Sequence, residues 1–190
     1  LYVKKVGSVE GIFPGTLPGK PISYEIEYGS SGAVRACGVI IEDIFPSEVI
    51  PNDPVDTFTT ASLVNAAGAE VSFVTPGNLP ISGAVGVTRV TLASGHYRWI
   101  IGNNGGLADP NVCIPRGAHG VFTVYGTIKG DVANGTFLLN TVSIAEDSPD
   151  VENVLSNNQD SSFVYVYRPD LTLMKDGVSC GTDATCASPV

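Results

Sequence analysis

The stretch Ile22-Ser-Tyr-Glu-Ile-Glu-Tyr28 decides the fold class of this chain. Its large apolar side chains alternate with Ser23, Glu25 and Glu27, which is the pattern of a strand with one buried and one solvated face. Turn-forming residues bound the stretch, with PGKP before it and GSSG after it. The stretch therefore predicts a half-buried β-strand.

Similar runs recur along the chain and are separated by turns rich in glycine and proline. They predict strands over 37–46, 71–75, 87–92, 96–101, 121–128, 137–144 and 163–167, with Phe163, Tyr165 and Tyr167 on one face of the last. The runs 87–92 and 96–101 flank a short ASG turn and predict a hairpin. Only 59–67 is compatible with a short helix. About eight or nine short strands joined by long loops predict one all-β domain, a sandwich or a barrel. We assign this domain to residues 1–168, and residues 169–190 to a C-terminal extension.

The composition excludes several classes of partner. The formal net charge is −9, and no basic cluster is present to bind nucleic acid. No run approaches the roughly 20 consecutive apolar residues of a membrane span, so membrane insertion is not expected. The 43% hydrophobic content is sufficient for a buried core.

The four cysteines, Cys37, Cys113, Cys180 and Cys186, allow three pairings. We favour Cys37–Cys113 and Cys180–Cys186, because the second pair flanks a short glycine-containing loop. The larger disulfide would stabilise the fold by roughly 4 kcal/mol in the chain-entropy treatment. Four free thiols are the alternative. Disulfide bonds predict an extracellular or cell-surface location.

The two ends of the chain resemble each other. Leu1-Tyr-Val-Lys-Lys-Val-Gly7 and Leu171-Thr-Leu-Met-Lys-Asp-Gly177 are identical at the first, fifth and seventh positions. The match predicts that the chain begins with the opening strand of a repeat and ends with the opening strand of the next, as in repeat arrays. Chance similarity between two short strands is the alternative.

Several segments, taken in order, resemble the conserved surface-repeat family called domain of unknown function eleven. Residues 21–28, followed by Val39-Ile-Ile-Glu-Asp-Ile-Phe-Pro46, resemble the opening strands of that family. Its later strands are similar to Cys113–Val124 and to Gly135-Thr-Phe-Leu-Leu-Asn-Thr-Val-Ser-Ile144. The sequence departs from the family at 28–31 and in a longer insertion at 46–69. The resemblance implies an immunoglobulin-like antiparallel β-sandwich in a secreted bacterial or archaeal surface protein. The family offers no catalytic residues to carry over.

Acidic and amide side chains gather near the predicted last strand, and they form a candidate calcium site. Hard oxygen ligands at this density suit Ca²⁺. The residues are Asp147, Asp150, Glu152, Asn157 and Asp160. Solvated surface loops are the alternative, and no other cofactor is expected. Asn134-Gly-Thr136 matches an N-glycosylation sequon in a predicted turn.

Nothing in the sequence predicts an enzyme. The two histidines, His96 and His119, have no nucleophile motif near them, and a metal site with Cys113 would lack further ligands at short spacing.

Two functions follow from these observations. The first is a structural subunit of an extracellular filament, tube or surface layer that assembles with copies of itself, head to tail, by donating a β-strand to a neighbour. Leu171 and Leu173 are the candidate donor residues, and Leu1 and Val3 are their rivals. The second is a binding repeat of a larger surface adhesin, contacting other cell-surface components.

Overall fold

The computed structural model describes residues 1–8, 15–56, 62–83, 85–146 and 155–168. These ranges contain nine strands of five or more residues, several two-residue strands and one single-turn 3₁₀ helix, η1 (Leu155–Asn157). The described ranges contain no helix long and apolar enough to cross a membrane.

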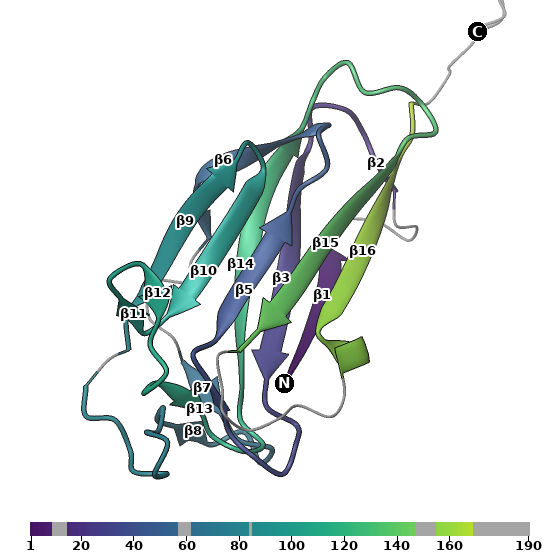
Figure 1. Ribbon diagram of the computed structural model, residues 1–190. Coiled ribbons are helices and arrows are strands. Elements are labelled where there is room, and N and C mark those ends of the chain that lie inside the picture. Colours follow the sequence, from purple (N-terminus) through teal and green to yellow (C-terminus); the bar gives the residue numbers. More distant parts are fainter. Residues whose placement is uncertain (9–14, 57–61, 84, 147–154, 169–190) are drawn as a thin grey trace, which may run out of the picture.

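Two β-sheets pack face to face (Figure 1). The first sheet follows the order β1 (Tyr2–Ser8), β3 (Pro21–Gly29), β14 (His119–Ile128), β7 (Leu63–Val64) and β8 (Glu70–Val71), and β6 (Val49–Asp56) also pairs with β14. The second sheet follows the order β2 (Gly15–Thr16), β16 (Gln159–Val166), β15 (Phe137–Ala145), β5 (Ile40–Ile44), β10 (His96–Ile101) and β9 (Val87–Ala93). All neighbours are antiparallel except β2 and β16. The all-β, immunoglobulin-like sandwich expected from the sequence is confirmed.

Two small ladders complete the described fold. The pair β4 (Ala36–Cys37) and β13 (Cys113–Ile114) lies near β7 and β8, at one end of the sandwich (Figure 1). The pair β11 (Asn103–Asn104) and β12 (Leu107–Ala108) forms a short hairpin after β10.

The core lies between the two sheets and is rich in aromatic side chains. The alternation in β3 is confirmed, because its tyrosines and isoleucines are all buried. Neighbouring rings in the core have centroids 5.1–6.2 Å apart, a spacing typical of favourable ring pairs; in order of contact they are Tyr24, Phe45, Tyr97, Trp99, Phe122 and Tyr28. Trp99 is fully buried and belongs to this core.

The short helix expected over 59–67 is wrong where the structure describes it. Residues 62–67 contain β7 and the turn that leads into β8. The Asn65 side-chain oxygen accepts hydrogen bonds from the backbone N–H groups of Ala67 and Ala69. An asparagine that bonds the backbone ahead of it favours a turn over a helix.

Two expected strands are shorter than predicted. Residues 71–75 supply only the end of β8 and an isolated bridge at Val74, and the 37–46 run is divided into β4 and β5. The division falls at Gly38, whose φ of 63° is in the left-handed region. The final strand begins earlier than expected, at Gln159. Phe163, Tyr165 and Tyr167 share one face, as predicted, and this is the outer face because Val164 and Val166 face the core.

Gly120 is a position at which a side chain would be poorly tolerated. A Cβ atom there would lie 2.8 Å from the backbone oxygen of Ser62 and would collide with the fully buried Tyr28 ring. Gly120→Ala is therefore expected to reduce the free energy of unfolding by about 1–3 kcal/mol, measured by denaturant titration. Gly130→Ala is the matched control, because nothing lies within 4 Å of its added Cβ. Equal stability of the two variants would contradict this packing.

Candidate functional site: a buried lysine, aspartate and asparagine

Three polar side chains meet inside the apolar core, and they come from strands that are distant in sequence. Lys5 belongs to β1 of the first sheet, and Asp43 and Asn140 belong to the neighbouring strands β5 and β15 of the second. Each occupies an inward position in the alternation of its strand. The Lys5 side chain therefore crosses the space between the sheets to reach the other two.

The lysine amine contacts both partners directly. Nζ of Lys5 contacts Oδ1 of Asp43 and donates a hydrogen bond of 2.7 Å to Oδ1 of Asn140. The side chains of Lys5 and Asp43 have no exposed surface, and Asn140 is also fully buried. The backbone N–H of Lys5 donates to Oδ2 of Asp160, 2.7 Å away, which holds β1 beside β16.

Aromatic rings exclude water from the cluster. Nζ of Lys5 lies 4.9 Å from the centroid of the Tyr24 ring and 6.0 Å from that of Phe45. A cation over an aromatic face is stabilised by the ring quadrupole, but two rings do not replace the hydration of an ammonium group. The surroundings therefore favour the uncharged form of the amine.

Burial shifts the pKa values of both ionisable partners toward neutrality. Removal from water lowers the pKa of the Lys5 amine to about 8, against the opposing effect of the nearby Asp43 carboxylate. Removal from water also raises the pKa of the Asp43 carboxyl group, against the opposing effect of Lys5. Both directions favour a neutral amine beside a neutral carboxylic acid. The core thus holds an amine, a carboxyl group and an amide in mutual contact.

Two atoms of the cluster have no hydrogen-bonding partner of normal geometry within the described part of the chain. They are Oδ2 of Asp43 and Nδ2 of Asn140, and both are buried. An unsatisfied buried polar atom costs about 1–3 kcal/mol. Such a cost inside a well-packed core requires an explanation beyond packing.

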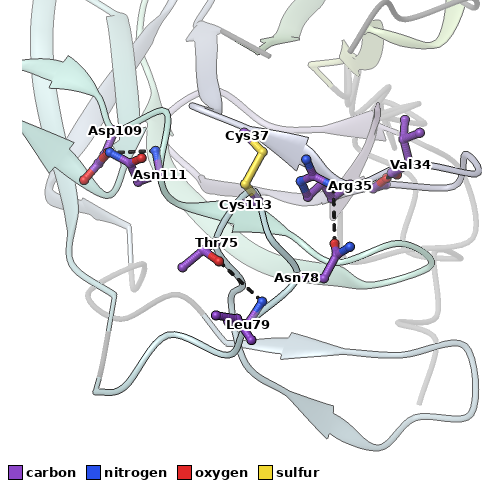
Figure 2. Close-up of a disulfide and its surroundings, with 10 residues drawn as sticks. Val34, Arg35, Cys37, Thr75, Asn78, Leu79, Asp109, Asn111 and Cys113 are labelled. Atoms are coloured by element: carbon purple, nitrogen blue, oxygen red, sulfur yellow. Dashed lines mark hydrogen bonds between the residues drawn. A yellow bond between two sulfur atoms is a disulfide. The ribbon is translucent and has the colours of Figure 1, made fainter. Parts of the chain in front are cut away.

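The predicted Cys37–Cys113 disulfide is confirmed, and it joins β4 to β13. Figure 2 shows it among loops that make hydrogen bonds to one another, such as Arg35 to Asn78 and the Leu79 N–H to the Thr75 hydroxyl. Both sulfur-bearing residues are fully buried. The bond fits an extracellular protein.

The structure describes only some of the residues that are predicted to donate a strand. Leu1 and Val3 are buried in the core of their own domain, and β1 pairs along its length with β3. Leu171, Leu173, Cys180 and Cys186 lie outside the described residues. Strand donation by the C-terminal segment, and the second disulfide, stay predictions.

The predicted calcium ligands are only partly described. Asp147, Asp150 and Glu152 lie outside the described residues, whereas Asn157 ends η1 and Asp160 lies in β16. The Asp160 carboxylate accepts hydrogen bonds from the backbone N–H groups of Lys5 and Ser161. Over the described ranges no group of three or more potential ligands is suited to a metal ion, and calcium stays a prediction.

The remaining candidates lie on the surface or in the sheets. Asn134 is exposed in a turn, where its side-chain oxygen accepts the backbone N–H of Arg168, and its glycosylation stays a prediction. His96 lies 3.3 Å from the Glu42 carboxylate on the outer face of β5 and β10. His119 pairs with Gly29 at the start of β14.

Sequence reasoning missed the buried cluster, although the signal was present. Lys5 follows Leu1 and Val3 with a spacing of two, and Asn140 lies between Leu138 and Val142 in the same way. Asp43 has the same relation to Ile41. One polar residue in the buried register of each of three strands is a detectable pattern, because such residues are seldom buried without partners.

The fold is similar to that of known surface proteins. A group B streptococcus pilus 2b backbone protein matches 86% of this chain over 56% of its own length, with 16% identity and a TM-score of 0.52. A collagen-binding domain from a Staphylococcus aureus adhesin matches 88% of this chain over 98% of its own, with 10% identity and a TM-score of 0.47. The chain thus spans just over half of the pilus protein, and identities this low show the fold alone. No family model and no curated protein matches the sequence.

Proposed function

We propose that this chain is a structural domain of an extracellular filament or surface layer, in which copies assemble head to tail. The observation that carries the proposal is the antiparallel sandwich itself, whose fold is similar to that of a pilus backbone protein. The Lys5–Asp43–Asn140 cluster links an edge strand of one sheet to two inner strands of the other and holds the two sheets of this domain together. The cluster is sealed inside the core, so it serves the domain itself and not a diffusing substrate.

Other observations support the same function. The confirmed disulfide fits secretion, and the sandwich is similar in fold to a pilus backbone protein. The similarity of the two chain ends supports strand exchange between copies. Residues 171–177 are identical to residues 1–7 at three positions, and residues 2–7 belong to β1, which pairs with β3 in its own sheet. The resemblance to the surface-repeat family would place the domain in a tandem surface protein.

The assembly prediction can be tested on the full chain. The unaltered protein is expected to form polymers that are visible by negative-stain electron microscopy, and Leu171→Asp/Leu173→Asp is expected to stay monomeric by sedimentation with an unchanged Tm. Charged side chains at those positions would prevent the strand from entering an apolar groove. The matched control is Leu107→Asp/Leu155→Asp, since both residues are exposed on the surface. Polymers formed equally by the 171/173 variant would exclude the C-terminal donor.

The alternative function, an adhesin repeat, has one specific observation in its favour. Phe137, Phe163 and Tyr165 cluster on the outer face of β15 and β16, with ring centroids 6.2 and 5.1 Å from Phe137. Phe137 and Phe163 are 66% and 55% exposed, which suits contact with a protein or a carbohydrate. An unaltered chain that stays monomeric at all concentrations would favour this second function.

A further inference from the structure

We infer that Lys5 and Asn140 become joined by an intramolecular amide bond, formed without an external enzyme, and that Asp43 is the catalytic acid and base for its formation. The inference rests on the geometry of the cluster and is independent of the proposed assembly. It concerns only residues that the structure describes.

The first step of the argument is the position of the nucleophile. Nζ of Lys5 lies 2.7 Å from Oδ1 of Asn140 and is therefore beside the carboxamide whose carbon it would attack. Both groups are held by strands of two packed sheets, which converts a slow reaction between separate molecules into one between fixed neighbours. Burial keeps a fraction of the amine uncharged near neutral pH, and only the uncharged amine is a nucleophile.

The second step is the identity of the acceptor, since the amine also contacts Asp43. If Lys5 joined Asp43, the remaining neighbour would be the Asn140 amide, which cannot transfer protons as a general acid or base. If Lys5 joins Asn140, the Asp43 carboxyl group stays free to donate and accept protons. Burial raises the pKa of the Asp43 carboxyl group, which favours the protonated form that can donate to the amide oxygen. Asn140 is therefore the acceptor.

The reaction balances without a cofactor. The Lys5 nitrogen bonds to Cγ of Asn140, and the electron pair of the carbonyl moves to Oδ1, which receives the proton of Asp43. The resulting carboxylate removes a proton from the attacking nitrogen and passes it to Nδ2. The carbonyl then re-forms, Nδ2 leaves as ammonia and Asp43 recovers its proton. The net change is one amine and one primary amide converted to one secondary amide and one ammonia, with no change in oxidation state.

The surroundings of the cluster favour formation of the amide bond between Lys5 and Asn140. Nδ2 of Asn140 makes no hydrogen bond of normal geometry in the described structure, so no well-formed hydrogen bond opposes its departure. The Tyr24 and Phe45 rings pack over Nζ and exclude the water that would otherwise hydrate the amine. The product removes a charged or titratable amine from the core and thereby relieves its desolvation.

The test is the intact mass of the purified full chain. We expect a mass that is lower than the sequence mass by one ammonia, beyond the hydrogens lost to disulfides, and a branched peptide that joins the segments containing Lys5 and Asn140 after proteolysis. A loss of one water, with Lys5 joined to Asp43, would overturn the choice of acceptor. A folded protein with the full mass after prolonged incubation would overturn the inference itself.

Variants separate the roles of the three residues. Asp43→Asn keeps the shape of the side chain, and its folded form should acquire the bond about 10²–10⁴-fold more slowly, because the proton shuttle is lost. Lys4→Met is the matched control for Lys5→Met, since Lys4 is exposed on the same strand and should leave the mass loss intact. Rapid bond formation in Asp43→Asn would show that Asp43 is not the catalyst. If Asp43→Asn does not fold, the mass of the unaltered chain still decides whether the bond exists.

Discussion

Asn140→Ala is expected to lower the free energy of unfolding by about 5 kcal/mol, because the chain would lose a covalent link between residues 135 positions apart. A cross-link of that span restricts the unfolded chain more than it restricts the folded one. Denaturant titration of the parent and the variant, both with the disulfide intact, measures the difference. The variant should also retain the full mass, which ties the loss of stability to the absent bond.

Comparing the stabilities of Asn140→Ala, Lys5→Met and the double variant shows whether the loss comes from one missing amide bond or from two separate side-chain changes. Either substitution removes the same cross-link, so each single variant and the double variant are expected to have similar stabilities. Residues that act as one unit show this kind of non-additivity. Lys4→Met should stay within about 0.5 kcal/mol of the parent, as expected for an exposed position. Losses that simply add in the double variant would mean that the two side chains contribute separately.

Cys37→Ala/Cys113→Ala is expected to cost about 4 kcal/mol, the second largest effect in the molecule. The disulfide joins residues 76 positions apart. The loop that it closes lowers the conformational entropy of the unfolded chain nearly as much as the loop between Lys5 and Asn140. The buried ladder of β4 and β13 would then depend on backbone hydrogen bonds, including those between Val74 and Cys113.

Chemical reduction provides the control for the cysteine variant. The parent protein is treated with a reductant under conditions that expose the disulfide. Its unfolding midpoint should then equal that of the double alanine variant. A variant as stable as the oxidised parent would show that the loops at this end of the sandwich are held by their own hydrogen bonds, such as that between Arg35 and Asn78.

Periodicity predicted the parts of the fold in which one face of a strand meets the core. The alternation of Ile22 to Tyr28, and the hairpin of β9 and β10, were readable because burial on one side imposes a spacing of two. The pairing of Cys37 with Cys113 was also preferred correctly. For the strands a local pattern was sufficient, whereas the cysteine pairing was preferred because of the short spacing between Cys180 and Cys186.

Prediction was less successful where contacts distant in sequence decide the structure. Strand β6 contains Pro51 and Pro54, which argue against a regular central strand, yet it pairs with β14 through an irregular register. The turn at Asn65 depends on one side-chain amide that competes with a helix. The buried cluster depends on three strands meeting, and no single segment of the sequence contains more than one of its members.

The placement of Lys5 and Asn140 also determines how the domain would respond to stretching. A pulling force that enters before Lys5 and leaves after Asn140 would pass through the side-chain bridge from β1 to β15. Every residue between the two, including the whole disulfide loop, would then carry no tension and could not extend. Residues 1–4, the remainder of β15 and the segment through β16 would stay in series with the force. Under load the domain would behave as an almost inextensible link, in which β16 is the one complete strand of the described structure outside the bridged segment.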